Sequence, residues 1–116
     1  MKIENIKFKA KKTLDGKWIK GDLVHHKDSD NVWITDYEKR LTSPVNPSTV
    51  CMFTGLTDKN GTPIYEGDIV MYKDNNAERI GDINWDSKAF CFGQGLLVHY
   101  PSENMVVIGN KFDKKK

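Results

Sequence analysis

Short runs in which apolar and polar residues alternate follow one another along almost the whole chain of 116 residues. A period of two places successive side chains on opposite faces of an extended strand, whereas an amphipathic helix needs apolar residues three and four positions apart. Only residues 35–41 offer helical spacing, with Tyr37 and Leu41 one turn apart. The pattern therefore predicts a mainly β protein that contains one short helical turn.

The predicted strands are short, and turn residues lie between them. In the first strand Ile6, Phe8 and Ala10 alternate with lysines, which predicts a half-buried strand with one basic face. Further strands are expected at residues 17–26, 32–35, 50–56, 67–72, 80–85, 96–100 and 105–110, with a hairpin at 85–92. Glycine, asparagine and aspartate favour tight turns, which we expect at residues 15–16, 28–31, 60–61, 73–78 and 86–88.

Residues 43–49 hold two prolines and predict an irregular connection between two lobes. The chain is long enough for one domain with a real core but not for two large ones. We therefore expect a single domain over residues 1–116. Within it, a β-rich N-terminal lobe would occupy residues 1–43 and a second β lobe residues 48–113.

A faint internal repeat agrees with two similar lobes. GDLVHHKD at residues 21–28 and GDIVMYKD at residues 67–74 share five of eight residues. Each copy runs from a glycine through a strand to a polar turn, so the repeat predicts the same local unit twice. Within the second copy, Ile69 and Met71 should face one side of the sheet and Val70 the other.

The bulk composition is that of an ordinary soluble protein, with 38% apolar and 29% charged residues. The chain has no run of about eighteen apolar residues that could span a membrane. Its lysine-rich start lacks the apolar segment of a secretory signal. We therefore expect a cytoplasmic protein with no membrane attachment.

The chain contains two cysteines, Cys51 and Cys91, and each stands among apolar or aromatic neighbours. A secreted disulfide scaffold would hold more cysteines, and a zinc site would show cysteines or histidines in closely spaced pairs. The sequence shows neither pattern. We expect two buried, reduced thiols, no structural metal and no cofactor.

Residues 54–70 crowd three glycines, an Asn-Gly pair and three carboxylates into one segment. An EF-hand loop needs glycine at its sixth position and a carboxylate at its twelfth, but counting from Asp58 the twelfth residue is Ile69. The carboxylates Asp58, Glu66 and Asp68 have no histidine or cysteine beside them, and turns commonly use aspartate to bind backbone groups. We predict neither catalytic nor metal-binding residues, and hence no enzyme.

The same segment is better explained as a hairpin that defines the fold. The pair Asn60 and Gly61 accepts positive φ, which suits a tight reversal between strands. Pro63 lacks an N–H donor and belongs at an edge or a strand entry. Gly67 supplies a second special backbone position, where the Asp68 carboxylate should accept from nearby N–H groups while it stays solvated.

Charge is distributed unevenly along the chain. The net charge is +2, but residues 1–12 carry +4 and residues 111–116 carry +3, so the body between them carries −5. An acidic body is not typical of a nucleic-acid-binding protein, although chain ends often lie close together and could form one basic patch. Otherwise the basic ends are a solvated strand face and a solubilising tail.

A nucleic-acid-binding module is nevertheless one hypothesis, because small β-barrels bind single strands with a basic track and stacking aromatic rings. Trp18 or Trp33 would supply the ring, although these tryptophans, like Trp85, also suit core positions. The candidate contacts are Lys7, Lys9, Lys11, Lys114, Lys115 and Lys116. We expect such binding to be weak, non-specific and carried by the chain ends.

Several motifs in a fixed order resemble the YopX family of phage and prophage proteins. They are NPSTV at residues 46–50, TGLTDKNGTPIYEGDIV at 54–70, INWD at 83–86 and VIGN at 107–110. The segment from Ile6 to Val24 is similar as well, so the resemblance covers roughly residues 2–113. The chain departs from the family at Lys20, at Cys51-Met52 and in its short end after Asn110.

The resemblance implies a small, SH3-like β-barrel in the C-terminal half and a gene on a prophage or conjugative element of a bacterium. It implies no reaction, because the family has no assigned activity. We therefore expect a non-enzymatic accessory protein of a phage or prophage that binds another protein in the host cytoplasm, with self-association left open. Weak binding of single-stranded or non-specific nucleic acid by the basic termini is the alternative.

An enzyme of unknown type is the third hypothesis. Besides the carboxylates its candidates are His25, His26 and His99. His25 and His26 should point to opposite faces of one strand, so they cannot bind a metal ion together.

Overall fold

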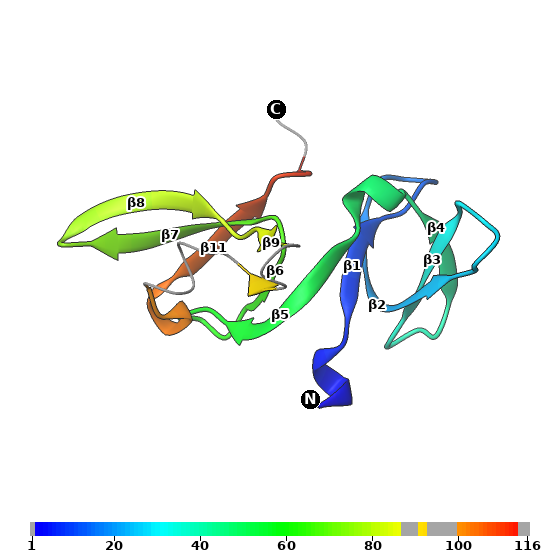
Figure 1. The fold of residues 1–116 in the computed structure, drawn as a ribbon, viewed down its shortest axis with the longest axis horizontal. Helices are drawn as coiled ribbons and strands as arrows, with labels where there is room; N and C mark the ends of the chain where they lie inside the picture. The colour runs from blue at the N-terminus through cyan, green and yellow to red at the C-terminus, as the bar shows by residue number, and fades with distance from the viewer. Residues whose placement is uncertain (1, 87–90, 93–99, 114–116) are drawn as a thin grey trace. The chain divides into compact units, whose positions relative to one another are not determined.

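The computed structural model describes residues 2–86, 91–92 and 100–113. Strands dominate it, and the described residues contain no α-helix, which confirms a mainly β protein (Figure 1). Three single 3₁₀ turns are η1 (Ile3–Asn5), η2 (Pro47–Thr49) and η3 (Ser102–Asn104). The strands are β1 (Phe8–Lys11), β2 (Trp18–His25), β3 (Val32–Asp36), β4 (Thr42–Val45), β5 (Cys51–Thr57), β6 (Pro63–Tyr65), β7 (Asp68–Asp74), β8 (Ala77–Asp82), β9 (Trp85–Asp86), β10 (Cys91–Phe92) and β11 (Val106–Asn110). Among the described residues, no helical segment has the length and apolar character that a membrane crossing needs.

The chain forms two compact units, Met1–Phe53 and Thr54–Lys116. Their boundary lies inside β5, further along the chain than the seam predicted at residues 43–49. Those residues are not an irregular connection either, because they complete β4 and form η2. Pro44 belongs to an edge strand of its sheet, where a residue without an N–H donor is tolerated.

In the first unit the strands follow the order β4-β3-β2-β1-β5, and every pair is antiparallel. The C-terminal end of β1 lies beside the C-terminal end of β4. An isolated bridge joins Lys12 to Val45, and the Asn46 N–H donates to the Lys11 carbonyl at 2.8 Å. The sheet therefore curls around one apolar face. The buried side chains on that face are Ala10, Ile19, Ile34 and Val45.

Residues 35–41 form the hairpin between β3 and β4 and no helix, but the hairpin contains the single helical turn that the sequence predicts, since the Arg40 N–H donates to the Asp36 carbonyl at 2.9 Å. The Asp36 carboxylate accepts hydrogen bonds from the N–H groups of Glu38 and Lys39 at 2.8 and 3.0 Å. Arg40 then takes a positive φ of 56° that reverses the chain. Asp36 therefore caps the start of this turn, because an N-cap side chain accepts from the second and third N–H groups that follow it, and the positive φ of Arg40 ends the turn.

In the second unit β7 lies between β11 and β8, β9 pairs with β10, and β6 is hydrogen-bonded to β5 as the last strand of the six-stranded sheet. The core contains Ile64, Val70, Ile83 and Met105. The described strands close into no barrel, so the small SH3-like barrel expected for residues 48–113 is not confirmed. The predicted hairpin at 85–92 is present as β9 and β10, while residues 96–99 of another predicted strand lie outside the described residues.

Asn60 and Gly61 lie in the turn between β5 and β6, where Gly61 has a φ of 79°. The Asp58 side chain organises this turn, because its Oδ1 accepts from the N–H groups of Asn60 and Thr62 at 2.8 and 2.9 Å. Its Oδ2 accepts from the N–H of Val107, also at 2.9 Å. A local turn is thereby joined to β11, far away in the sequence.

Gly67 lies in the turn between β6 and β7 with a φ of 84°, and Asp68 is the first residue of β7. Asp68 is fully buried, so the prediction of a solvated carboxylate is wrong. Its Oδ2 accepts from the Tyr65 N–H at 2.8 Å and its Oδ1 accepts from Nδ2 of Asn110 at 2.9 Å. The carboxylate therefore joins the turn before β7 to the end of β11.

The two copies of the internal repeat differ in structure. Gly21 lies inside β2, where a Cβ atom would stand 1.8 Å from the carbonyl oxygen of Thr35. Gly67 instead precedes its strand and supplies a positive φ. The first glycine is required by a close approach of two strands and the second by a turn.

We predict that Asp68→Asn lowers the free energy of unfolding by about 1–3 kcal/mol, because an amide would turn an N–H donor toward Tyr65 or Asn110, which already donate. Urea denaturation monitored by circular dichroism measures the change. Asp82→Asn is the control, since Asp82 is exposed on β8 and should change stability by less than about 0.5 kcal/mol. Equal midpoints for both variants would contradict the role of Asp68.

Candidate functional site

The lysines predicted to contact nucleic acid lie on the outer face of the first sheet. Lys9 stands opposite Lys20, and Lys11 stands opposite Trp18. Residues opposite each other in antiparallel strands share a face, and the neighbouring residues Ala10 and Ile19 are buried on the other face. The structure therefore brings together a basic row and an aromatic ring. Lys114, Lys115 and Lys116 lie outside the described residues.

The lysine row is only partly solvated, because each of its three ammonium groups lies over an aromatic ring. The Lys7 ammonium lies 4.3 Å from the centre of the Phe53 ring, and those of Lys9 and Lys11 lie 4.7 and 5.4 Å from the Trp18 ring. Lys9 is only 9% exposed. Cation–π contacts of this kind hold the ammonium groups against the protein's own rings. Both the charges and the Trp18 ring are thus partly occupied within the chain.

The tryptophans expected in the core are only half-buried where the structure describes them. Trp18 and Trp33 are half-buried and belong to neither apolar cluster, whereas the Trp85 side chain lies outside the described part. His26 packs its ring edge against Trp33 with 5.3 Å between ring centres. His25 and His26 are both exposed, and His99 is outside the described residues.

Two of the three carboxylates considered for catalysis, Asp58 and Asp68, accept hydrogen bonds from backbone N–H groups. The oxygens of Asp58 and Asp68 accept from N–H groups of turns and of β11, as described above. The third carboxylate, that of Glu66, belongs to a half-buried residue. In residues 2–86, 91–92 and 100–113, no group of three histidine, cysteine or acidic side chains is placed to hold a metal ion. Cys51 is buried, and its Sγ lies 3.3 Å from the Thr49 carbonyl oxygen.

The pKa of Asp58 lies below its ordinary value. Burial alone would raise this pKa, because it disfavours the charged carboxylate, but the hydrogen bonds from Val107, Thr62 and Asn60 stabilise the charge and prevail. Asp58 is therefore ionised at neutral pH and acts as an acceptor rather than as an acid. This supports a structural role for a residue that the sequence left among the catalytic candidates.

A surface that sequence reasoning missed lies on the sheet β11-β7-β8. Val106 stands opposite Met71, and Met71 stands opposite Ile80, so one apolar side chain from each strand forms a row across the sheet. The other face carries Val70, which is part of the buried core, and Val107, which packs against that core. Ile80 is 66% exposed, and Met71 and Val106 are half-buried. We call these three residues the open-face row.

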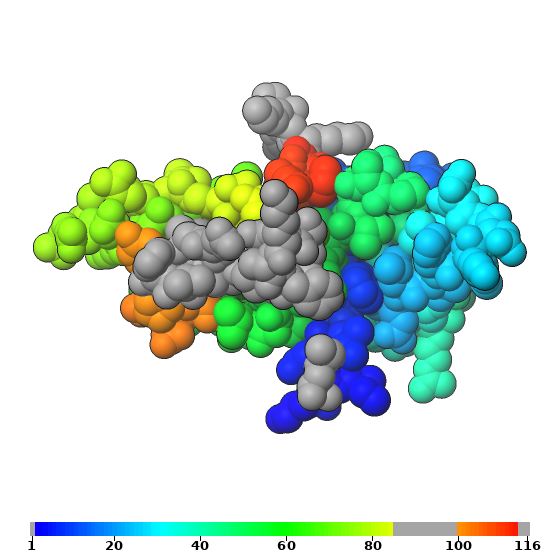
Figure 2. All heavy atoms as spheres, in the orientation of Figure 1, coloured from blue at the N-terminus to red at the C-terminus, as the bar shows by residue number. Residues whose placement is uncertain are grey.

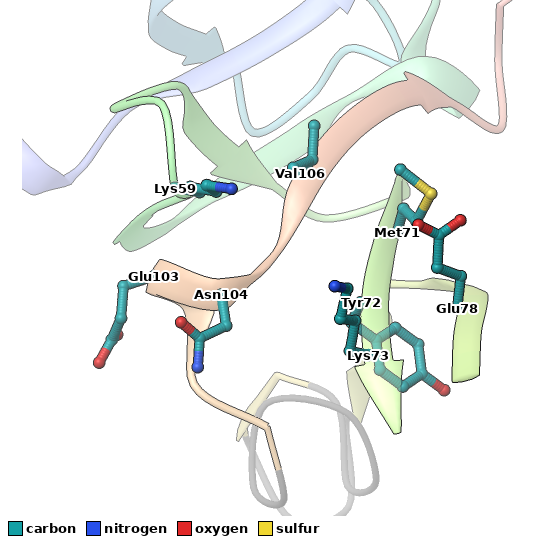
Figure 3. Close-up of a pocket in the computed structure, with 8 residues that line it drawn as sticks. All are labelled: Lys59, Met71, Tyr72, Lys73, Glu78, Glu103, Asn104 and Val106. Atoms are coloured by element: carbon teal, nitrogen blue, oxygen red, sulfur yellow. The ribbon is translucent and has the colours of Figure 1, made fainter. Parts of the chain in front are cut away.

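A hollow of about 490 Å³ adjoins this row (Figure 3). It is lined by Lys59, Met71, Tyr72, Lys73, Glu78, Glu103, Asn104 and Val106. In Figure 3 the Met71 and Glu78 side chains lie next to each other, and Lys59 extends from the β5–β6 turn on the side of Val106. The lining mixes two apolar residues, Met71 and Val106, with charged side chains of both signs.

The alternation of β7 contained a signal for this surface. The sequence predicts that Ile69 and Met71 face one side of the sheet and Val70 the other. The structure confirms this, because Val70 is buried while Ile69 and Met71 are only half-buried. The sequence did not show which face would be covered. That depended on Ile64, Ile83 and Met105, which come from other segments and bury Val70.

A family model described as YopX protein matches residues 7–115. No curated protein matches the chain. Because the match covers nearly the whole chain, the protein belongs to the YopX family, as the resemblance in its motifs predicted.

We predict that Asp58→Asn weakens the acid dependence of stability. A carboxyl group whose pKa is lowered on folding stabilises the protein above its unfolded pKa of about 3.9, and this contribution is lost as the pH falls through the folded value. The pKa values of Asp15 and Asp36 are also lowered by backbone N–H donors, so the wild type should lose stability in acid and the variant should lose less. Urea unfolding at several values between about pH 6 and pH 2 measures both slopes. If the free energy of unfolding falls equally with pH in the wild type and in Asp58→Asn, the pKa of Asp58 is not lowered on folding.

Proposed function

We propose that this member of the YopX family is a non-enzymatic accessory protein of a phage or prophage, which acts in the host cytoplasm by binding another protein. The observation that carries the proposal is the open-face row of Val106, Met71 and Ile80. Single exposed apolar side chains are normal on protein surfaces, but a contiguous apolar row beside a hollow is typical of interaction sites.

The position of the row within the fold supports the same function. The opposite face of this sheet already covers the core cluster of Ile64, Val70, Ile83 and Met105, so the row adds nothing to that core. A large apolar side chain at 66% exposure, such as Ile80, gains little stability for the free protein. Its burial by a partner would remove that apolar surface from water.

The chemistry of the carboxylates supports a non-enzymatic role. Asp58 and Asp68 are both buried, and backbone or amide donors hold their oxygens. A general acid needs a carboxyl whose pKa is raised toward neutrality, whereas that of Asp58 is lowered.

Binding of nucleic acid is a second candidate, and the observation that favours it is the basic row beside Trp18. Lys7, Lys9 and Lys11 lie on the face that also carries Lys20. The cation–π contacts compete with phosphate for the ammonium groups, so we expect weak binding that depends strongly on salt.

We predict that the protein, used as bait in an extract of its bacterial host, retains one or a few proteins that survive washing. Ile80→Lys should reduce their recovery at least about fivefold, because it places a charge in the apolar row. Leu14→Lys is the matched control, since Leu14 is 93% exposed in the other unit and should leave recovery unchanged. If no protein is enriched over a mock bait, protein binding as the function is wrong.

We predict that any affinity for single-stranded nucleic acid falls by several decades per tenfold rise in salt. Removal of Lys114, Lys115 and Lys116 should reduce the slope of log affinity against log salt by about two to three units. Gel shifts over a salt series with the full and the shortened chain measure both slopes. Tight binding at physiological salt that survives the truncation would favour nucleic acid over protein as the partner.

A further inference from the structure

β8 is an edge strand of the three-stranded sheet in the second unit. β8 is the last strand in the order β11-β7-β8, so one of its edges pairs with no strand of that sheet. Its residues are exposed at 77–80 and at 82 (Figure 2, the yellow-green segment). The outward N–H and C=O groups of such an edge are a template on which an extended segment can add a strand.

The geometry of the β7–β8 hairpin identifies the outward groups. Asn75 and Asn76 both have positive φ, 49° and 72°, and so form a two-residue hairpin turn. In such a turn the two flanking residues, here Asp74 and Ala77, are a hydrogen-bonded pair. Hydrogen-bonded and non-hydrogen-bonded pairs then alternate along the ladder. At the other end of the hairpin the Ile83 N–H donates to the Asp68 carbonyl at 2.9 Å, so Asp68 and Ile83 are a hydrogen-bonded pair, as this alternation requires. The backbone groups of Glu78, Ile80 and Asp82 therefore point away from β7.

The side chains of these three residues share one face of the sheet. They stand opposite Lys73, Met71 and Ile69, so Ile80 is the outermost member of the open-face row. Glu78 and Asp82 flank it, and neither makes an ion pair within the part of the chain that the structure describes. Arg79 belongs to the other face, where it forms an ion pair with Asp74 at 3.0 Å. The free edge thus displays an acidic, an apolar and an acidic side chain.

Charge decides which strand fits this edge. Opposite charges on cross-strand neighbours stabilise a sheet, and like charges destabilise it. A second copy of β8 would bring only carboxylates and Ile80 to the pairing face, so it offers no cation to Glu78 or Asp82. The two acids therefore discourage self-pairing and favour a segment with basic residues two positions on either side of an apolar one.

We propose that β8 binds an extended segment of a partner protein as an added antiparallel strand. The segment carries a basic, an apolar and a basic residue at alternate positions. The basic side chains lie beside Glu78 and Asp82, and the apolar side chain extends the open-face row beyond Ile80. Main-chain hydrogen bonds to the three outward residues hold the strand in place. This inference rests on the proposed function, since it specifies the partner and the surface of a protein that acts by binding.

Fluorescence anisotropy with a labelled peptide, Thr-Lys-Thr-Val-Thr-Lys-Thr, and the full-length protein tests this proposal. We expect saturable binding at least about tenfold tighter than that of the same peptide with glutamate for both lysines. The double variant Glu78→Lys/Asp82→Lys should reverse this preference. The matched control, Asp28→Lys/Glu38→Lys, makes the same change in net charge at exposed residues of the first unit. This control should still prefer the lysine peptide to the glutamate peptide.

A peptide N-methylated at its lysine and valine amides separates strand addition from simple attraction of charges. In an antiparallel added strand these N–H groups face β8, so the methylated peptide should bind at least about tenfold more weakly. Equal binding of the methylated and unmethylated peptides would overturn the added strand. Equal binding of the lysine and glutamate peptides to the wild type would overturn the basic partner.

Capture from the host extract, repeated with Glu78→Lys/Asp82→Lys, separates failure of this inference from failure of the proposed function. If wild type and variant retain the same protein equally well, the protein acts by binding but not through the β8 edge, and the inference falls. If the peptides behave as expected but the wild type enriches no host protein, the proposed function falls instead. Loss of the captured protein from the variant alone supports both.

Discussion

The buried carboxylate of Asp68 is the interaction on which the second unit depends. Its two oxygens hold the Tyr65 N–H before β7 and the Asn110 amide at the end of β11, two segments that are far apart in the sequence. Backbone bonds of Gly67 to Ile83 and Lys111 act at the same point. A carboxylate without exposure to water needs such donors, so the contact has only one favourable geometry.

That geometry sets the candidate binding surface. Pairing of Asp68 with Asn110 begins the ladder between β7 and β11, and the ladder continues through a bulge to Met71 opposite Val106. Asp58 holds the same strand from the other side through the Val107 N–H. A shift of β11 by one residue would exchange its two faces and remove Val106 from the row. The surface thus depends on two buried acids that are not part of it.

Sequence reasoning failed where side chains act at a distance along the chain. The alternation around Lys9 was recognised, yet the ring of Trp18 covers the ammonium group from the neighbouring strand. Asp68 was expected to accept from a nearby N–H, which is correct, but its burial comes from segments around Ile83 and Asn110. The weak helical spacing after Asp36 produces only one capped turn, because the positive φ of Arg40 ends it before a helix can form.

The sequence by itself determined the mainly β architecture, most strand positions, the turns at Asn60-Gly61 and Asn75-Asn76, and membership of the family. These features follow from local physics, since alternation and positive φ act within a few residues. Only the tertiary structure decided which face of β7 is buried, which acids are desolvated, and that β8 is an edge. A period of two separates Val70 from Met71, but burial of one face is a property of strand order and non-local packing.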